Sequence, residues 1–190
     1  MKVIAFNGSP RKGGNTSQLV DLVFKPLAEA GIDTERIDIC KHRPRGCIGC
    51  FKCLEKKNGK CVIKDDPVNE WIAQAADADA IILASPTYFA NVSAEMKALV
   101  DRMGLVGRAN GLFDRKIGAS VVAVRRGGAV PTFDAMNHMM QINQMILVGS
   151  IYWNFGFGLM PGDIETDDEG LQTMQNLGEN LAWLLDRLGK

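Results

Sequence analysis

The chain has 190 residues, of which 46% are hydrophobic and 23% are charged, as in an ordinary globular protein with one full core. Lysine plus arginine equal aspartate plus glutamate at 22 each, so the net charge indicates neither a nucleic-acid partner nor an acidic surface. No apolar run approaches the roughly 20 residues of a membrane-spanning helix, and no secretory signal segment is evident. We expect a single cytoplasmic domain over residues 1–190, with no membrane or nucleic-acid contact.

Strand and helix patterns alternate along the chain. A first strand is predicted over Lys2–Asn7 and a first helix from Asn15. Further strands are expected over residues 34–40, 80–84, 117–124 and 146–153, with helices over 67–76, 93–103, 131–145 and 168–188. The apolar runs at 80–84 and 117–124 are typical of strands buried on both faces. The alternation predicts an α/β fold: a doubly wound, five-stranded parallel sheet between two layers of helices.

Residues 8–17, between the first strand and its helix, carry hydrogen-bond donors and no acid: Ser9, Arg11, Asn15, Thr16 and Ser17. Free N–H groups and the helix dipole at such a junction suit an anion. Gly14 stands where a triphosphate-binding loop needs lysine, and Pro10 stands where the dinucleotide motif needs glycine. The segment therefore predicts a site for a phosphate monoester such as that of FMN. The alternative is a loop that merely turns the chain.

Two further loops follow buried strands and would meet the first one at the carboxyl edge of a parallel sheet. The first offers flat rings and polar groups through Pro86, Thr87, Tyr88, Phe89 and Asn91. That mixture suits the faces and polar edge of a flavin ring. The second carries two cations and two glycines: Arg125, Arg126, Gly127 and Gly128. The alternatives are an aromatic loop packed on its own core and a solvated basic turn.

The segments Asn7-Gly8-Ser9-Pro10-Arg11, Gly14-Asn15-Thr16-Ser17 and residues 85–91 resemble the flavodoxin-like NAD(P)H-dependent FMN reductase superfamily. The resemblance implies a flavodoxin-like sheet of order 2-1-3-4-5 with bound FMN. It implies that the phosphate lies near residues 9–17 and the ring near residues 86–91 and 125–128. It further implies NAD(P)H as electron donor and, by analogy with this fold, a homodimer or homotetramer.

Four cysteines lie in a loop over about residues 41–64, at C-x₂-C-x₂-C-x₇-C spacing: Cys47, Cys50, Cys53 and Cys61. Thiols stay reduced in the cytoplasm, so metal binding or redox activity is favoured over disulfides. The spacing looks like that of iron–sulfur flavoproteins, which implies these four as ligands of a [4Fe–4S] cluster. Zinc, a thiol–disulfide centre and an empty loop are the alternatives. Cys40 lies outside the pattern and is interpreted as a structural cysteine.

The combined pattern predicts an FMN-dependent oxidoreductase that exchanges electrons with small-molecule or protein donors and acceptors. The flavin carries the chemistry, so no side chain is assigned a catalytic role. A flavodoxin-type carrier without its own substrate, a cluster-free NAD(P)H quinone or flavin reductase, and an FMN-free binding module are the alternatives. The neutral charge favours an enzyme over a carrier, since flavodoxin-type carriers are usually strongly acidic.

Overall fold

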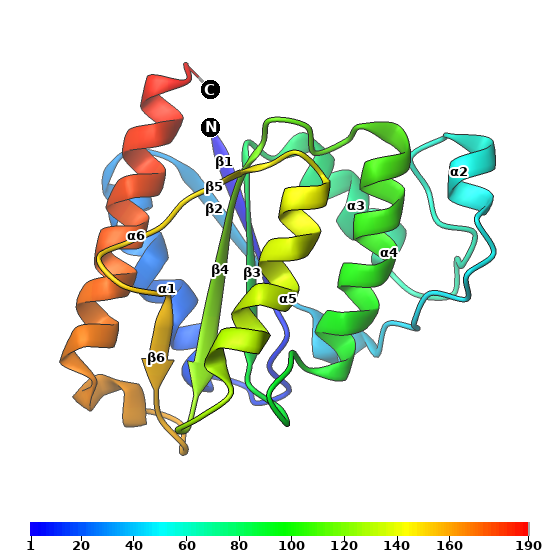
Figure 1. Ribbon diagram of the computed structural model, residues 1–190. Helices are drawn as coiled ribbons and strands as arrows, with labels where there is room; N and C mark the ends of the chain where they lie inside the picture. Colours follow the sequence, from blue (N-terminus) through cyan, green and yellow to red (C-terminus); the bar gives the residue numbers. More distant parts are fainter. Residues whose placement is uncertain (190) are drawn as a thin grey trace.

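The computed structural model describes residues 1–189 and contains one parallel sheet between two layers of helices (Figure 1). The hydrogen-bonded strand order is β2-β1-β3-β4-β5, with β6 also paired to β4. This order confirms the predicted doubly wound arrangement. The strands are β1 (Lys2–Asn7), β2 (Asp33–Asp38), β3 (Ala80–Pro86), β4 (Ile117–Val124), β5 (Ile146–Leu147) and β6 (Phe155–Phe157).

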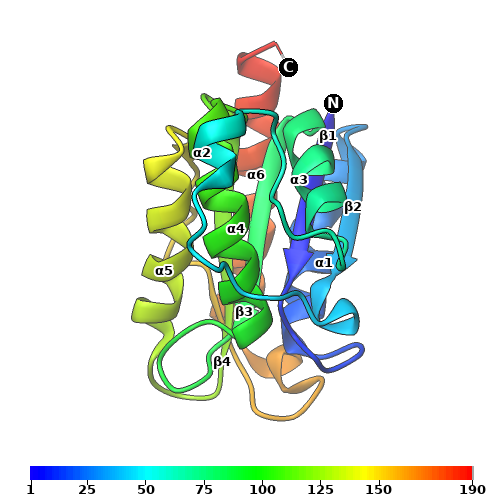
Figure 2. The ribbon, with the colours of Figure 1, turned by 90° about the vertical axis from the view of Figure 1, so that its right-hand side faces the viewer.

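The two helical layers bury opposite faces of the same strands. Val3 and Ala5 of β1 join the core under α1 (Asn15–Glu29) and α6 (Asp168–Arg187). Ile4 and Phe6 join the core on the other face, because successive side chains of a strand point to opposite sides. That face is covered by a layer of helices, which the turned view in Figure 2 shows from the outside. They are α3 (Val68–Asp77), α4 (Ala94–Asn110) and α5 (Ala129–Ile142).

The segment between β2 and α3 lies outside the α3–α4 layer (Figures 1 and 2). It begins with a 3₁₀ turn, η1 (Ile39–His42), and contains a short helix, α2 (Lys52–Lys56), that packs on α4. The predicted second strand is therefore too long, because residues 39 and 40 belong to the turn. Residues 43–51 contain no regular element, so the cysteine segment is held by specific contacts and not by a backbone ladder.

The last predicted strand, 146–153, is wrong in its extent. β5 pairs with β4 only at Ile117 and Gly118, and β6 pairs with its other end from Val122. Between them, the side chain of Asn154 donates to the carbonyl of Ser120 at 2.9 Å. The intervening chain bulges away, and residues 151–153 are exposed. An apolar run cannot reveal such a break, yet the break brings the chain after β6 to the carboxyl edge of the sheet.

The remaining predicted helices are present, but their first and last residues differ from the prediction. Helix α4 runs to Asn110, about two turns beyond the predicted end at residue 103. A second 3₁₀ turn, η2 (Asp163–Thr166), precedes α6. No helix within residues 1–189 is both long and apolar enough to cross a bilayer.

Candidate functional site

The start of α1 presents unpaired N–H groups at the carboxyl edge of the sheet. The backbone N–H groups of Asn15 and Thr16 donate no backbone hydrogen bond within residues 1–189. Gly14, the N-cap, contributes no side-chain cap, and the first turn contains no acid. The positive end of the helix dipole is thus uncompensated, which is the condition for anion binding. Ser17, predicted as a ligand, instead donates its hydroxyl to the carbonyl of Gly14 at 2.7 Å.

Gly8 lets the end of β1 lie against the start of α4. Its N–H donates to the carbonyl of Ala84 at 2.8 Å. A Cβ at this position would lie 2.9 Å from both Met96 Cβ and Ser93 Oγ. Any side chain here would push the loop after β1 away from the start of α4, so the glycine fixes where the loop begins.

The chain after β6 forms a further wall of this site, which the sequence did not reveal. Arg11 Nη1 donates to the carbonyl of Leu159 at 2.6 Å, and the N–H of Gly162 donates to Asn15 Oδ1 at 2.9 Å. A Cβ on Gly158 would lie 2.6 Å from Asn15 Nδ2. The only signal in the sequence was the pair Gly156 and Gly158, which flank the last residue of β6. The pairing of β6 with β4 is a long-range contact, and no local sequence pattern predicts it.

A cavity of about 100 Å³ collects predicted residues from three loops. Its lining includes Ser9, Arg11, Asn15, Thr16, Pro86, Thr87, Tyr88 and Arg125, together with Ala123, Gly158 and Leu159. Thr87 Oγ1 is buried and has no hydrogen-bond partner within the described chain. An unsatisfied buried hydroxyl is costly, and here it belongs to the wall of the cavity. A residue that lines the cavity thus carries an unused hydrogen-bonding group.

A second hollow of about 260 Å³ contains others of the predicted residues, Arg126 and Gly128. Aromatic side chains line it as well, including Tyr152, Trp153 and Phe157. Gly128 has φ +86°, and its Cβ would lie 2.9 Å from the Cα of Ala90, so the two predicted ring-binding loops touch.

Phe89, Asn91 and Gly127 line neither hollow. Phe89 has a positive φ of 47°, and its side chain projects fully into solvent. Asn91 Oδ1 accepts from the N–H of Val92 at 2.8 Å, which stabilises the turn before α4. Phe89 is therefore available at the rim, whereas Asn91 has a local structural contact.

The four patterned cysteines line one small cavity on the outer side of α4: Cys47, Cys50, Cys53 and Cys61. The other walls are mostly apolar, with Leu105, Val106 and Arg102 coming from α4. Cys47 and Cys50 are exposed, whereas Cys53 is buried. The space is only about 20 Å³. No three histidine, cysteine or acidic side chains within residues 1–189 are arranged to hold a single metal ion.

Asn69 of α3 fixes the backbone of Cys61 on both sides. Its Oδ1 accepts from the N–H of Cys61 at 2.7 Å, and its Nδ2 donates to the carbonyls of Cys61 at 3.1 Å and Ile63 at 2.9 Å. One amide side chain thus substitutes for a strand partner. Asn69 follows Cys61 by eight residues, on a helix that sequence patterns treat as merely amphipathic.

Arg102 joins the two ends of the cysteine segment. Its guanidinium is fully buried and forms an ion pair with Asp66. Nη1 also donates to the carbonyl of Arg45 at 3.1 Å, and Nη2 to that of Ile63 at 3.2 Å. Its Nε is buried without a partner in the described residues and belongs to the residue lining the cysteine cavity. Asp66 and Arg102 are 36 residues apart in the sequence, and no local pattern links them, so the arginine's role was missed.

The ionisable groups around the segment reflect this packing. Burial alone would raise the pKa of Asp66, but hydrogen bonds from Arg102 and from the N–H groups of Arg45 and Val68 lower it below 3.8. Burial and the nearby Glu95 carboxylate raise the pKa of Cys40 to about 12. The Cys40 thiol therefore stays protonated, in keeping with its interpretation as structural.

These loops can be compared with known proteins. The sequence model of the NADPH-dependent FMN reductase family matches residues 1–159. The chain belongs to this family. This FMN reductase family member is 41% identical to an iron–sulfur flavoprotein of Methanocaldococcus jannaschii, with all of both chains covered. An iron–sulfur flavoprotein of Archaeoglobus fulgidus is 36% identical over 96% of this chain and 79% of its own.

Among solved structures, a WrbA-like flavodoxin protein of Agrobacterium tumefaciens matches this family member with a TM-score of 0.67 at 16% identity. The match covers 98% of this chain and 97% of the other, and it supports the flavodoxin-like fold. The predictions of that fold and of an FMN-dependent oxidoreductase similar to iron–sulfur flavoproteins are confirmed. The polar lining of the cavity and the free N–H groups of α1 fit FMN.

Proposed function

We propose that FMN binds with its phosphate at the start of α1 and its ring toward the 86–91 and 125–128 loops. The observation that carries this proposal is the buried, unpartnered hydroxyl of Thr87, a residue that lines the cavity shared by these loops. The phosphate would accept from the N–H groups of Asn15 and Thr16 and from the side chains of Ser9, Thr16 and Arg11. Ser17 supports this site indirectly through its bond to Gly14.

The flavin supplies two-electron and one-electron redox chemistry at its ring when bound. The chain's own residues orient the cofactor and provide charge. Arg125 lies in the cavity wall, where its cation favours an electron-rich ring. Gly128 lets the backbone of the two loops approach closely, and Tyr88 and the exposed Phe89 offer flat apolar surface beside the opening. The proposal needs no general acid or base, and we assign none.

We further propose that Cys47, Cys50, Cys53 and Cys61 hold a [4Fe–4S] cluster, which would supply single-electron transfer. Support comes from the common cavity that the four thiols line and from the unpartnered Arg102 Nε beside them, a donor suited to thiolate sulfur. Each iron of such a cluster takes one thiolate, so the four thiols need not converge on a single ion as they would around zinc. Because the space is small, the exposed segment with Cys47 and Cys50 must open outward on loading.

The cluster proposal is tested by measuring iron and acid-labile sulfide per FMN on anaerobically purified and reconstituted protein. We expect about four of each per FMN, and a strong loss in Cys61→Ala. Cys40→Ala is the matched control and should retain full iron, because Cys40 lies outside the cavity. Fewer than about one iron per FMN in the wild type would refute the cluster and leave a cluster-free flavin reductase.

We also propose NAD(P)H as electron donor, cytoplasmic location and a homodimer or homotetramer. The exposed aromatic cluster of Tyr152, Trp153 and Phe157 beside the second hollow supports a subunit contact there. Stopped-flow mixing with NADH or NADPH should bleach the flavin rapidly. Reduction by a protein carrier alone would favour a flavodoxin-type carrier, and a monomer in light scattering would refute the assembly.

A further inference from the structure

Arg102 places a positive charge, fully shielded from solvent, beside the cysteine cavity. Its side chain is 0% exposed, and the side chain of its partner Asp66 is 3% exposed. Arg102 lines the cavity together with Leu105 and Val106, two apolar residues of the same helix. Water and salt screen a buried charge much less than a surface charge. The guanidinium therefore acts on the neighbouring thiols more strongly than an exposed lysine would.

The hydrogen bonds of the Arg102 guanidinium leave one donor unused. Nη1 donates to the carbonyl of Arg45 at 3.1 Å and to the carboxylate of Asp66, and Nη2 donates to the carbonyl of Ile63 at 3.2 Å. These contacts fix the plane of the group, so they also fix the position of Nε. Nε is buried and has no hydrogen-bond partner within residues 1–189. The guanidinium interacts electrostatically with Cys61, which identifies Cys61 as the thiol on which the cation acts.

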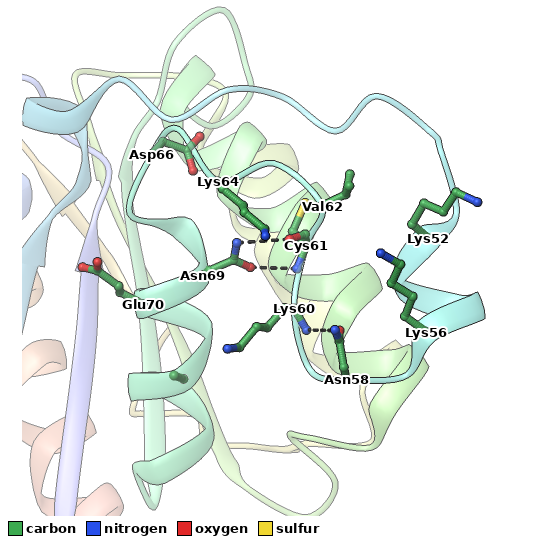
Figure 3. A pocket seen from close by; sticks show the side chains of 11 residues that line it. Lys52, Lys56, Asn58, Lys60, Cys61, Val62, Lys64, Asp66, Asn69 and Glu70 are labelled. Carbon is green, nitrogen blue, oxygen red and sulfur yellow. Dashed lines mark hydrogen bonds between the residues drawn. The ribbon is translucent and has the colours of Figure 1, made fainter.

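The backbone of Cys61 is held by Asn69, which Figure 3 shows reaching it from α3. Asn69 Oδ1 accepts the N–H of Cys61 at 2.7 Å, so that N–H is already used and does not serve a sulfur. The carbonyl of Ile63 accepts both from Asn69 at 2.9 Å and from Arg102. The two side chains thus hold the same short segment, and the position of Cys61 relative to the guanidinium is fixed.

We propose that Arg102 raises the reduction potential of the cluster by acting on Cys61 as a buried, charged hydrogen-bond donor, and this inference rests on the [4Fe–4S] cluster proposed above. Net charge, hydrogen bonds to sulfur and solvent exposure set the potential of such clusters. Uptake of one electron adds one negative charge, which a fixed cation stabilises. Asp66 opposes this effect from farther away, because it does not line the cysteine cavity. Arg102 acts through Cys61 and is therefore a positioning residue, not a cluster ligand.

A redox titration of the anaerobic, iron-loaded holoprotein with dithionite and mediators, followed by electron paramagnetic resonance, measures this potential. Arg102→Gln alone would leave the Asp66 carboxylate buried without a partner, so the main variant is Arg102→Gln/Asp66→Asn, in which both charges become neutral amides. We expect its equilibrium constant for one-electron reduction to fall at least about tenfold, which is about 59 mV toward more negative potential. Asp66→Asn alone keeps the cation and removes the anion, so its potential should rise.

Two further variants separate buried charge from other effects. Lys60→Gln removes one cation from the exposed residue that precedes Cys61 and should change the equilibrium constant less than about twofold, because solvent screens that charge. Arg102→Lys keeps a buried cation and should change the constant less than about threefold. Iron and acid-labile sulfide are measured in every sample, and each resonance signal is normalised to the iron content.

An unchanged potential in Arg102→Gln/Asp66→Asn would overturn the inference, as would a potential in Asp66→Asn that does not rise. The single variant therefore decides the matter where the double variant loads no iron. Wild-type protein without iron would refute the cluster itself, and this inference with it, and iron analysis shows that before any titration. The two proposals therefore fail by different readouts.

Discussion

The substitution Thr87→Val tests whether the hydroxyl of Thr87 forms a hydrogen bond with bound FMN. The hydroxyl is buried and unpaired, while the backbone of Thr87 is fixed by its N–H bond to Ala123 at 2.8 Å. Valine keeps the branched shape and removes only the polar atom. Burying an unpaired hydroxyl costs about 1–3 kcal/mol. The variant should therefore raise the free energy of unfolding of the FMN-free protein by about 1 kcal/mol or more.

The same change should weaken FMN binding. In the complex the wild-type hydroxyl gains a partner, whereas valine gains nothing, so about 1–2 kcal/mol of binding free energy is lost. That loss corresponds to a roughly five- to thirtyfold rise in Kd. The variant is thus more stable without FMN and binds FMN less tightly, a combination that general damage to the loop would not produce.

Calorimetry of the FMN-free protein and quenching of flavin fluorescence on titration measure the two effects. The expected rise in Tm is about 2–4 °C for a chain of this size. Thr173→Val in α6 is the matched control, because that buried hydroxyl donates to the carbonyl of Glu169 at 2.7 Å. It should lower Tm and leave FMN affinity unchanged. A fall in Tm for Thr87→Val with unaltered FMN affinity would refute the reasoning.

Two further substitutions examine the other contacts. Thr16→Ala with Arg11→Ala should weaken FMN binding by about 2–4 kcal/mol through lost charge-assisted hydrogen bonds; unchanged affinity in equilibrium dialysis would mean that the phosphate lies elsewhere. Asp66→Asn should lower the free energy of unfolding by about 3–5 kcal/mol at pH 7, because the buried Arg102 cation loses its partner. Because the pKa of Asp66 is lowered in the folded protein, its ion pair stabilises the fold fully above about pH 3.8. That stabilisation is lost as the pH falls through the lower, folded-state pKa. Urea melts should therefore show that the difference in unfolding free energy between the wild type and Asp66→Asn shrinks on acidification. A difference that does not change with pH would contradict the ion pair.

The sheet could be predicted because its residues report their own environment. The residues of β4 are apolar or small and buried throughout, and the loop before α1 lacks any acid. Both features could therefore be predicted from the local sequence. The break between β5 and β6 could not be predicted from the sequence, because it depends on a hydrogen bond from the Asn154 side chain to Ser120 on another strand. Wall residues such as Leu159 were missed for the same reason.

The cysteine pattern was visible, but what fixes it was not. Arg102 lies 39 residues beyond Ile63, one of its bonded partners, and nothing in α4's sequence distinguishes a buried arginine from an exposed one. Charged side chains are expected on the outside of a helix, so a buried guanidinium is visible only in three dimensions. Phe89 is a different case: its side chain is fully exposed, and its contact with a flavin ring stays a prediction.

Helix α4 sets the distance between the loop after β1 and the cysteine segment. It starts beside Gly8, where its N-cap Ser93 accepts from the N–H of Met96 at 3.2 Å, and it holds the cysteine segment at Arg102. The nine residues between those anchors correspond to about 14 Å of helix. Loop motion at either end leaves this spacing unchanged, because a packed helix neither stretches nor slides by fractions of a turn. The separation between the loop after β1 and the cysteine anchor at Arg102 is thus set by a rigid helix, while the loops at each end can differ in chemistry.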